Sequence, residues 1–289
     1  MTSTPIETAR SESVVLMGAT TDGRVAFSTR LGRFPTLGVS WVWLHVSVSG
    51  ESFGFASEEL TSDAGIVDGR VASAVYDVAD GAVLGCWARR GPPEEPRSMT
   101  VALVVPGHRG EDVPDGPGPI SLSVTAHLEP ESPTLATLAG RTEVVGRVTG
   151  TLTTGDLRTS FDGLGHFHEQ VQDGERFTTP FTYASLWGEG AGIIAIQTPN
   201  RDLGQVWWDG SLSTLRSATF HPSFPELPIR LVEVTTDERT IEGPFELVAL
   251  NTHNLRQRLW TGSFVKGMLN SRPMVGAINR FDPEAQRPG

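Results

Sequence analysis

The sequence has few of the features that mark disulfide-stapled or membrane-spanning proteins. Its 289 residues include one cysteine, Cys86, so no disulfide can form within the chain, and such a composition is typical of a reducing compartment. Cys86 lies in an apolar run at residues 83–87, without an adjacent histidine or other base. We therefore expect a buried structural thiol.

Basic residues and long apolar runs are also scarce. The chain has 23 basic and 34 acidic residues, a formal net charge of −11, and no basic run, which argues against nucleic acid or an anionic membrane as a partner. Its apolar runs are far shorter than the roughly 20 residues of a membrane helix, and residues 1–12 lack the apolar core of a signal peptide. We expect a soluble, cytoplasmic protein whose oligomeric state the sequence leaves open.

Helical periodicity is almost absent, whereas 32 glycines and 20 prolines divide the chain into short segments. Residues 41–48 alternate, with Val42, Leu44 and the following valines on one face and Trp41, Trp43 and His45 on the other. Residues 121–129 alternate in the same way. We therefore expect an all-β chain with a helix content below about 15 %.

Further short runs are candidate strands. They are residues 71–76, 101–105, 144–152, 182–186, 193–197, 205–208, 229–234 and 245–251. Many short strands with glycine and proline turns indicate a β-sandwich or β-barrel architecture. Residues 129–140 could form a short helix or a linker, so we place a domain boundary there. The prediction is an N-terminal β domain of residues 1–140 and a C-terminal β domain of residues 141–289.

The motifs of common cofactor enzymes are missing. The sequence contains no P-loop, no glycine-rich dinucleotide turn, no His-Glu-x-x-His and no Gly-x-Ser-x-Gly. We therefore expect no nucleotide, flavin or other organic cofactor.

The most unusual segment carries two histidines at alternate positions. On a strand, His166, His168 and Gln170 share one face, and Phe167 and Glu169 take the other. The imidazoles could ligate a metal, act as an acid/base pair, or simply form a polar strand face. No third ligand is recognisable from spacing, so we predict no metal. We expect His166 and His168 to be catalytic and to point into an apolar cavity, with Glu169 or Gln170 orienting them.

Aromatic side chains follow this segment. Phe181, Tyr183 and Trp187 alternate on one strand face, and Trp207 and Trp208 come soon after. Together they could form an aromatic wall for a large apolar ligand or carbocation, or be ordinary core. Two adjacent tryptophans cannot share a face, so at least one should reach a pocket, an interface or solvent. The predicted substrate contacts are Gln170, Phe181, Tyr183, Trp187, Trp207, Trp208, Trp41 and Trp43.

Several short motifs occur in a recognisable order. Gly-Leu-Gly-His-Phe-His at 163–168 is followed by Tyr-Ala-Ser-Leu-Trp-Gly at 183–188. Earlier, Asp-Gly-Arg at 22–24 precedes Arg-Phe-Pro-Thr-Leu-Gly at 33–38, a tryptophan strand, and Gly-Glu-Ser-Phe-Gly-Phe at 50–55. This order resembles the hydroxyneurosporene synthase (carotenoid 1,2-hydratase)-like group, in which a glycine-rich His-x-His strand precedes an aromatic strand ending in Trp-Gly. Phe167 stands where that group's pattern has an aspartate.

The resemblance implies a tandem lipocalin-like (calycin) fold. Members bind polyenes, terpenoids or polyketides between or inside two barrels; some add water to an olefin, and related fungal members are cofactor-free Diels–Alderases. His166 and His168 would match the group's His-x-His. We thus expect an enzyme of specialised metabolism that cyclises, isomerises or hydrates such a substrate. The alternatives are a non-catalytic lipid- or isoprenoid-binding protein and a metalloenzyme using the two histidines.

Overall fold

The computed structural model describes residues 10–34, 36–61, 74–78, 82–90, 98–137, 140–174, 176–223, 228–255 and 258–284, with the side chains of residues 59, 61 and 74–90 outside that description. Every regular element in these ranges is a β-strand, so the predicted all-β class is confirmed. The described part of the chain contains no helix with the length and hydrophobicity that a membrane span requires. The predicted burial of Cys86 and the start of the candidate strand at 71–76 lie outside the described residues.

The first sheet has ten strands in the order β4-β3-β2-β1-β11-β10-β9-β7-β6-β5. Their bounds are β1 Ser11–Ala19, β2 Val25–Phe34, β3 Val39–Val48, β4 Glu51–Thr61, β5 Ala74–Val78, β6 Ala82–Arg90, β7 Met99–Arg109, β9 Ile120–Pro130, β10 Arg141–Thr154 and β11 Leu157–Gln172. Because β4 also pairs with β7, eight of these strands close into a barrel.

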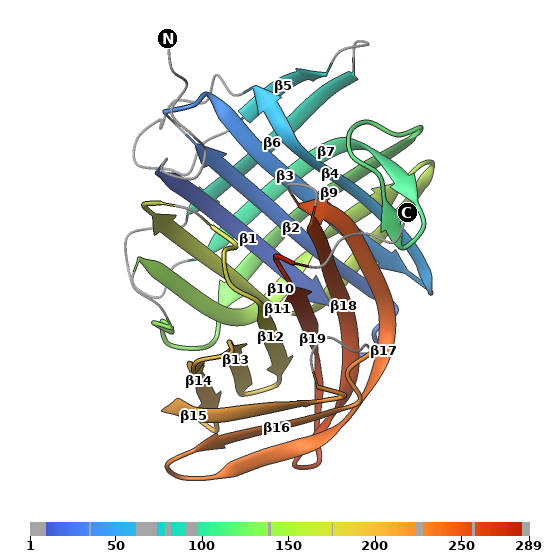
Figure 1. Cartoon of the computed structure of the whole chain (residues 1–289). Coiled ribbons are helices and arrows are strands. Elements are labelled where there is room, and N and C mark those ends of the chain that lie inside the picture. Colours follow the sequence, from blue (N-terminus) through green and yellow to red (C-terminus); the bar gives the residue numbers. More distant parts are fainter. Residues whose placement is uncertain are drawn as a thin grey trace.

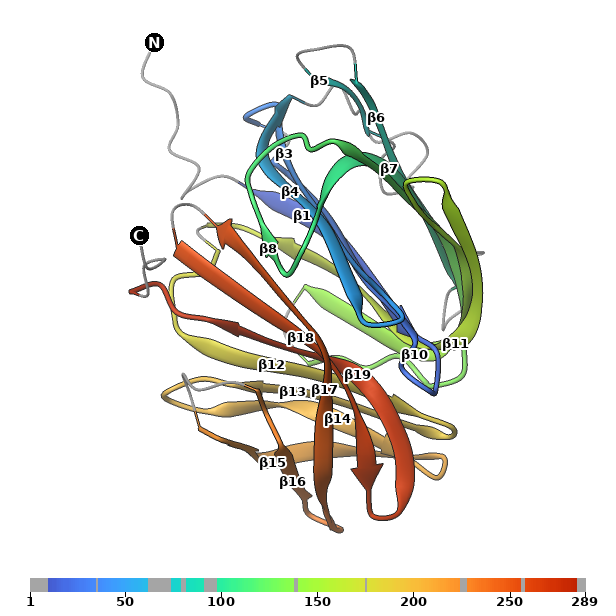
Figure 2. The ribbon, with the colours of Figure 1, turned by 90° about the vertical axis from the view of Figure 1, so that its right-hand side faces the viewer.

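The second sheet has nine strands in the order β16-β15-β14-β13-β12-β19-β18-β17-β8. Their bounds are β8 Asp112–Val113, β12 Phe181–Gly188, β13 Ala191–Gln197, β14 Asp202–Trp208, β15 Ser211–His221, β16 Leu231–Thr236, β17 Thr240–Leu255, β18 Arg258–Leu269 and β19 Arg272–Phe281. The strands from β16 to β17 in this order are antiparallel to their neighbours. β16 also pairs with β17, so the first and last strands of this antiparallel series are joined. Figures 1 and 2 show the blue-to-green first sheet packed against the yellow-to-red second sheet.

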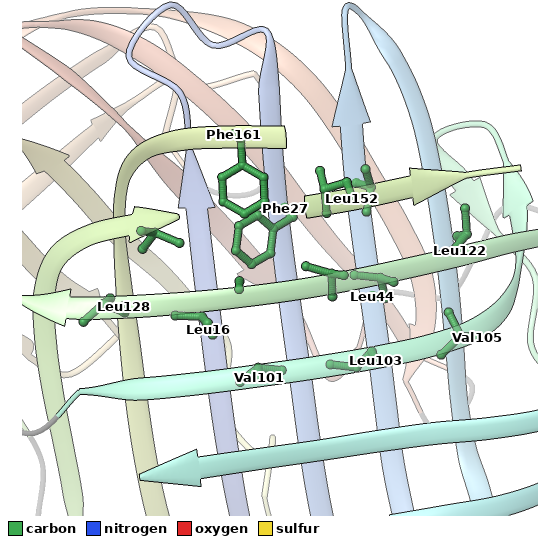
Figure 3. Close-up of a cluster of buried hydrophobic side chains, with 14 of the residues drawn as sticks. Leu16, Phe27, Leu44, Val101, Leu103, Val105, Leu122, Leu128, Leu152 and Phe161 are labelled. Carbon is green, nitrogen blue, oxygen red and sulfur yellow. The ribbon is translucent and has the colours of Figure 1, made fainter. Parts of the chain in front are cut away.

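Side-chain alternation explains how the two sheets pack. Leu16, Phe27 and Leu44 point into the first barrel and form its apolar core, which Figure 3 shows. Trp41 and Trp43, on the opposite face of β3, join a cluster with side chains of the second sheet. Strands such as β1 and β3 are therefore buried on both faces, one inside the barrel and one between the sheets.

The predicted division at residue 140 does not match the boundary between the sheets. It falls between β9 and β10, which pair with each other in the first sheet. The chain passes to the second sheet later, through the connection between β11 and β12. Residues 131–137 belong to a connection within one sheet, because β9, β10 and β11 form a continuous antiparallel series.

Candidate active site

A cavity of about 190 Å³ lies between the two sheets. Strands β1, β2, β3, β10 and β11 line it from the first sheet, and β12, β13, β17, β18 and β19 line it from the second. The connection between β11 and β12 contributes Arg176 and Phe177. Clefts that combine apolar walls with a few polar groups are the usual places for small-molecule sites.

Strand β11 brings its polar side chains to the cavity as the alternation predicts. His168 and Gln170 line the cavity, whereas Phe167 belongs to the core of the first barrel. His166 shares the face of His168 and is completely buried, but it does not line the cavity. Glu169 alternates to the other side of β11 and is not a lining residue.

Aromatic rings form an apolar wall of the cavity. The rings of Trp43 and Trp260 are 5.3 Å apart, and those of Phe177 and Trp260 meet edge to face at 5.7 Å. Phe181 lies 5.8 Å from Trp260, and Tyr183 also lines the cavity. Flat, rigid rings of this kind suit a large hydrophobic ligand.

The other predicted aromatic contacts lie away from this cavity. Trp41 is packed beside it, 4.6 Å from the ring of Phe34, without lining it. Trp187 and Trp208 line a separate hollow near the β18–β19 turn. Trp207 is buried in the cluster between the sheets and Trp208 in the core of the second sheet, so the adjacent tryptophans do face opposite sides.

A buried carboxylate that the sequence analysis did not identify lies at the centre of the polar groups. Glu143 is completely buried and accepts hydrogen bonds from Arg141 Nε, from Thr137 Oγ1 at 3.0 Å and, at 3.5 Å, from Tyr183 Oη. In the β10–β11 pairing, Glu143 stands opposite His168. The alternation of Arg141 and Glu143 just before the predicted strand at 144–152 is the one sequence signal that could have found this pair.

The hydrogen bonds of His168 define its proton position. Arg141 Nη2 lies 3.0 Å from His168 Nδ1. Because a guanidinium only donates, Nδ1 must accept, and the neutral ring carries its proton on Nε2. Nε2 is buried and has no hydrogen-bond partner among the described residues. His168 therefore offers one unused N–H donor at the cavity.

Burial keeps the site's histidines neutral. Burial, and then the charge of Arg141, lowers the pKa values of His166 and His168 well below 6.5. Burial raises the pKa of Glu143, which the charge of Arg141 offsets only in part. Burial and the charge of Glu143 raise the pKa of Tyr183 above its usual range. At neutral pH, His168 and Tyr183 therefore act as neutral hydrogen-bonding groups.

One combination of residues could hold a metal ion. Ligand atoms of Glu143, His166 and His168 all lie within 4.8 Å of one another, and two histidines with one carboxylate are a common iron-binding set. Arg141, however, donates hydrogen bonds to both Glu143 and His168. A cation bound here would lie beside the positive charge of Arg141, which already neutralises Glu143, so the arrangement suits an ion-paired hydrogen-bond network better than a metal.

Comparisons with known proteins identify the fold. No family model and no curated protein matches the sequence. Among solved structures, a Nitrosomonas europaea protein described as an AttH candidate (NE1406) is 12 % identical with a TM-score of 0.61, and the match covers 94 % of this chain and 92 % of that one.

Two further structural neighbours have described chemistry. CghA, a Diels–Alderase, bound to Sch210972, is 13 % identical with a TM-score of 0.55 over 95 % of this chain and 88 % of that one. Kievitone hydratase from Nectria haematococca is 10 % identical with a TM-score of 0.53 over 97 % and 91 %. The chain has the lipocalin-like fold of these proteins, which confirms the fold implied by the sequence resemblance.

Proposed function

We propose that this chain is a cofactor-independent enzyme that cyclises, isomerises or hydrates a hydrophobic polyene, terpenoid or polyketide in the cavity between the two sheets. The observation that carries the proposal is the unused Nε2–H of His168 beside aromatic walls in one cavity. Structural neighbours that are a Diels–Alderase and a hydratase support a reaction of this kind.

The cavity offers two means of catalysis. The aromatic walls can hold a flexible apolar chain in a folded conformer, which brings its reacting carbons together and lowers the entropic part of the barrier. A hydrogen bond from His168 Nε2 to a substrate carbonyl would polarise a conjugated double bond. In a cycloaddition, π bonds are converted into σ bonds within one molecule, so no proton or electron needs to be supplied.

Hydration or a double-bond shift also requires a proton to move. Tyr183 lines the cavity and its hydroxyl contacts Glu143, whose pKa burial raises. Glu143 would therefore take up or supply this proton, and the neutral hydroxyl of Tyr183 would relay it to or from the bound substrate.

A gene deletion in the host organism provides the test. The deletion strain should accumulate an unprocessed hydrophobic compound, and purified protein added to its extract should convert that compound. A product of equal mass indicates cyclisation or isomerisation, and a product heavier by one water indicates hydration. His168→Ala should be slow, whereas His127→Ala, a change to a half-exposed histidine of β9, should be as active as wild type.

The alternative is a non-catalytic protein that binds hydrophobic ligands. The depressed pKa values of His166 and His168 favour it, because neither ring is poised to exchange a proton near pH 7. In that case a compound from the extract would remain bound to the protein and be recovered unchanged. Recovery of an unchanged compound, with no other compound converted, would refute the enzymatic proposal.

A further inference from the structure

The cavity is rich in positive charge although the protein is acidic. The chain has a formal net charge of −11, yet Arg30, Arg141 and Arg176 line the cavity, and no aspartate or glutamate among the described residues does. Arg141 is neutralised by Glu143. Arg30 and Arg176 form no ion pair with a carboxylate among the described residues. This is unusual, because buried arginines normally have an anionic partner.

Arg30 is held in place by aromatic rings. It is 7 % exposed, and its Cζ lies 4.8 Å from the ring centroid of Trp43 and 5.1 Å from that of Phe177. Its Nε is buried and has no hydrogen-bond partner in the described part of the chain. Stacking fixes the plane of the guanidinium and leaves its edge free to donate to a ligand.

Arg176 is oriented by hydrogen bonds to uncharged groups. It is 6 % exposed and donates from Nε to Ser11 Oγ, from Nη1 to Ser13 Oγ at 3.1 Å, and from Nη2 to the carbonyl of Gln170 at 3.4 Å. These bonds use three of the five N–H groups of a guanidinium. None of them goes to a carboxylate.

The connection between β11 and β12 is shaped to bring these groups together. Phe177 has a φ of 62°, a strained value for a residue with a bulky side chain, and Arg258 Nη1 donates to its carbonyl at 3.3 Å. This conformation places the ring of Phe177 against the guanidinium of Arg30. Arg176, the preceding residue in the sequence, lines the same cavity. Backbone strain of this kind is typical of functional sites.

The buried guanidiniums repel one another. Burial, and then the charges of Arg176 and Arg141, lowers the pKa of Arg30 well below 12.5, although Glu58 acts in the opposite direction. Burial and Arg141 lower the pKa of Arg176 to about 10. An anion in the cavity would relieve both effects.

We propose that Arg30 and Arg176 form a subsite for a carboxylate or similarly sized organic anion on the substrate, so that the cavity takes amphipathic acids, with an apolar chain and one ionised head group. The inference rests on the proposed function, since it specifies the class of substrate. Planar, preorientated guanidiniums bind carboxylates through paired hydrogen bonds. The head group would anchor the molecule at the first sheet and leave its chain against the aromatic walls.

Binding of a fluorescent polyene tests the subsite separately from catalysis. The probes are parinaric acid, a conjugated tetraene fatty acid, and its methyl ester, which has the same chain without the charge. Wild-type protein should bind the acid at least about tenfold more tightly than the ester, because one hydrogen bond to a charged group contributes enough binding free energy for a tenfold difference in affinity. Arg30→Gln and Arg176→Gln should each remove most of this preference and change ester affinity by no more than about twofold.

Arg33→Gln is the matched control. Arg33 lies on β2 with Arg30 and is equally buried, but it pairs with Glu12 and does not line the cavity. This variant should retain the preference for the acid, and melting temperatures should show that each variant is folded. Equal affinity of wild type for both probes would refute the anion subsite and leave the proposed function standing. A preference that survives in both Arg30→Gln and Arg176→Gln would also refute it, and failure to bind either probe would count against both proposals.

Discussion

Removing the buried carboxylate Glu143 should destabilise the protein strongly. Glu143 is completely buried, and the side chain of Arg141 is 9 % exposed. In Glu143→Leu, Arg141 keeps its charge in the interior but loses its carboxylate partner, while Thr137 and Tyr183 lose an acceptor. Breaking a buried ion pair from one side typically costs about 3–5 kcal/mol of unfolding free energy.

Removing both charges should be much less harmful. Replacement of a buried pair by apolar residues of similar volume is often neutral or stabilising. The double variant Arg141→Met/Glu143→Leu should therefore regain most of the lost stability and unfold within about 1–2 kcal/mol of wild type. His168 would then lose the donor to its Nδ1, so activity should stay low even though stability returns.

Equilibrium urea denaturation followed by tryptophan fluorescence measures these differences. The exposed pair of Arg147 and Asp162 provides the control, and Asp162→Asn should leave the unfolding midpoint unchanged because solvent screens surface ion pairs. A loss below about 1 kcal/mol in Glu143→Leu would refute the reasoning. A double variant no more stable than the single one would refute it equally.

Further predictions concern the histidines. His168→Ala should lower turnover at least about tenfold with a small fall in melting temperature, since loss of one hydrogen-bond donor to a developing charge costs about 10²–10³ in rate; full activity of this variant would contradict a role for His168 in the reaction. Burial lowers the pKa of His45 to about 4 and those of His166, His168 and His253 well below 6.5, so stability should be complete above pH 6.5 and fall as pH drops toward 4, by about 1.4 kcal/mol per pH unit for each neutral buried histidine. A urea midpoint that stays constant over this window would contradict that. Elemental analysis should find no stoichiometric zinc or iron, because a cation bound to His166, His168 and Glu143 would lie beside the positive charge of Arg141; one metal per chain, with activity lost on chelation, would contradict this.

The fold could be predicted where one strand face differs from the other. Residues 121–129 lie within β9, whose alternate side chains point into the first barrel or toward solvent, and this pattern is visible in the sequence. Strand β1 was not predicted, because its neighbours bury both faces and its apolar run at residues 14–17 leaves no polar alternation to recognise. The passage from the first sheet to the second, between β11 and β12, was not predicted either. Composition does not show that the β10–β11 hairpin is the last hairpin of the first sheet.

The site could be predicted only within single strands. The shared face of His168 and Gln170 follows from spacing alone. Glu143 reaches His168 through the register of β10 and β11. Arg176 comes near Arg30 because the connection after β11 packs on β1, where Arg176 donates to Ser11 and Ser13. Neither register nor packing is visible in one sequence, so the acidic and basic partners of the histidine strand were missed.

The distribution of charge around the cavity indicates how a substrate would be oriented. Arg30 and Arg141 belong to the first sheet, and Arg176 lies in the connection that leaves it. The second sheet contributes aromatic, aliphatic and uncharged polar side chains to the cavity, among them Trp260 and Phe264, and none of its described lining residues is charged. Because moving an ionised group from a guanidinium to an apolar wall is unfavourable, an amphipathic acid would bind in one orientation. A single orientation fixes which carbons of a folded chain meet, and a cyclase without a cofactor has to control that step.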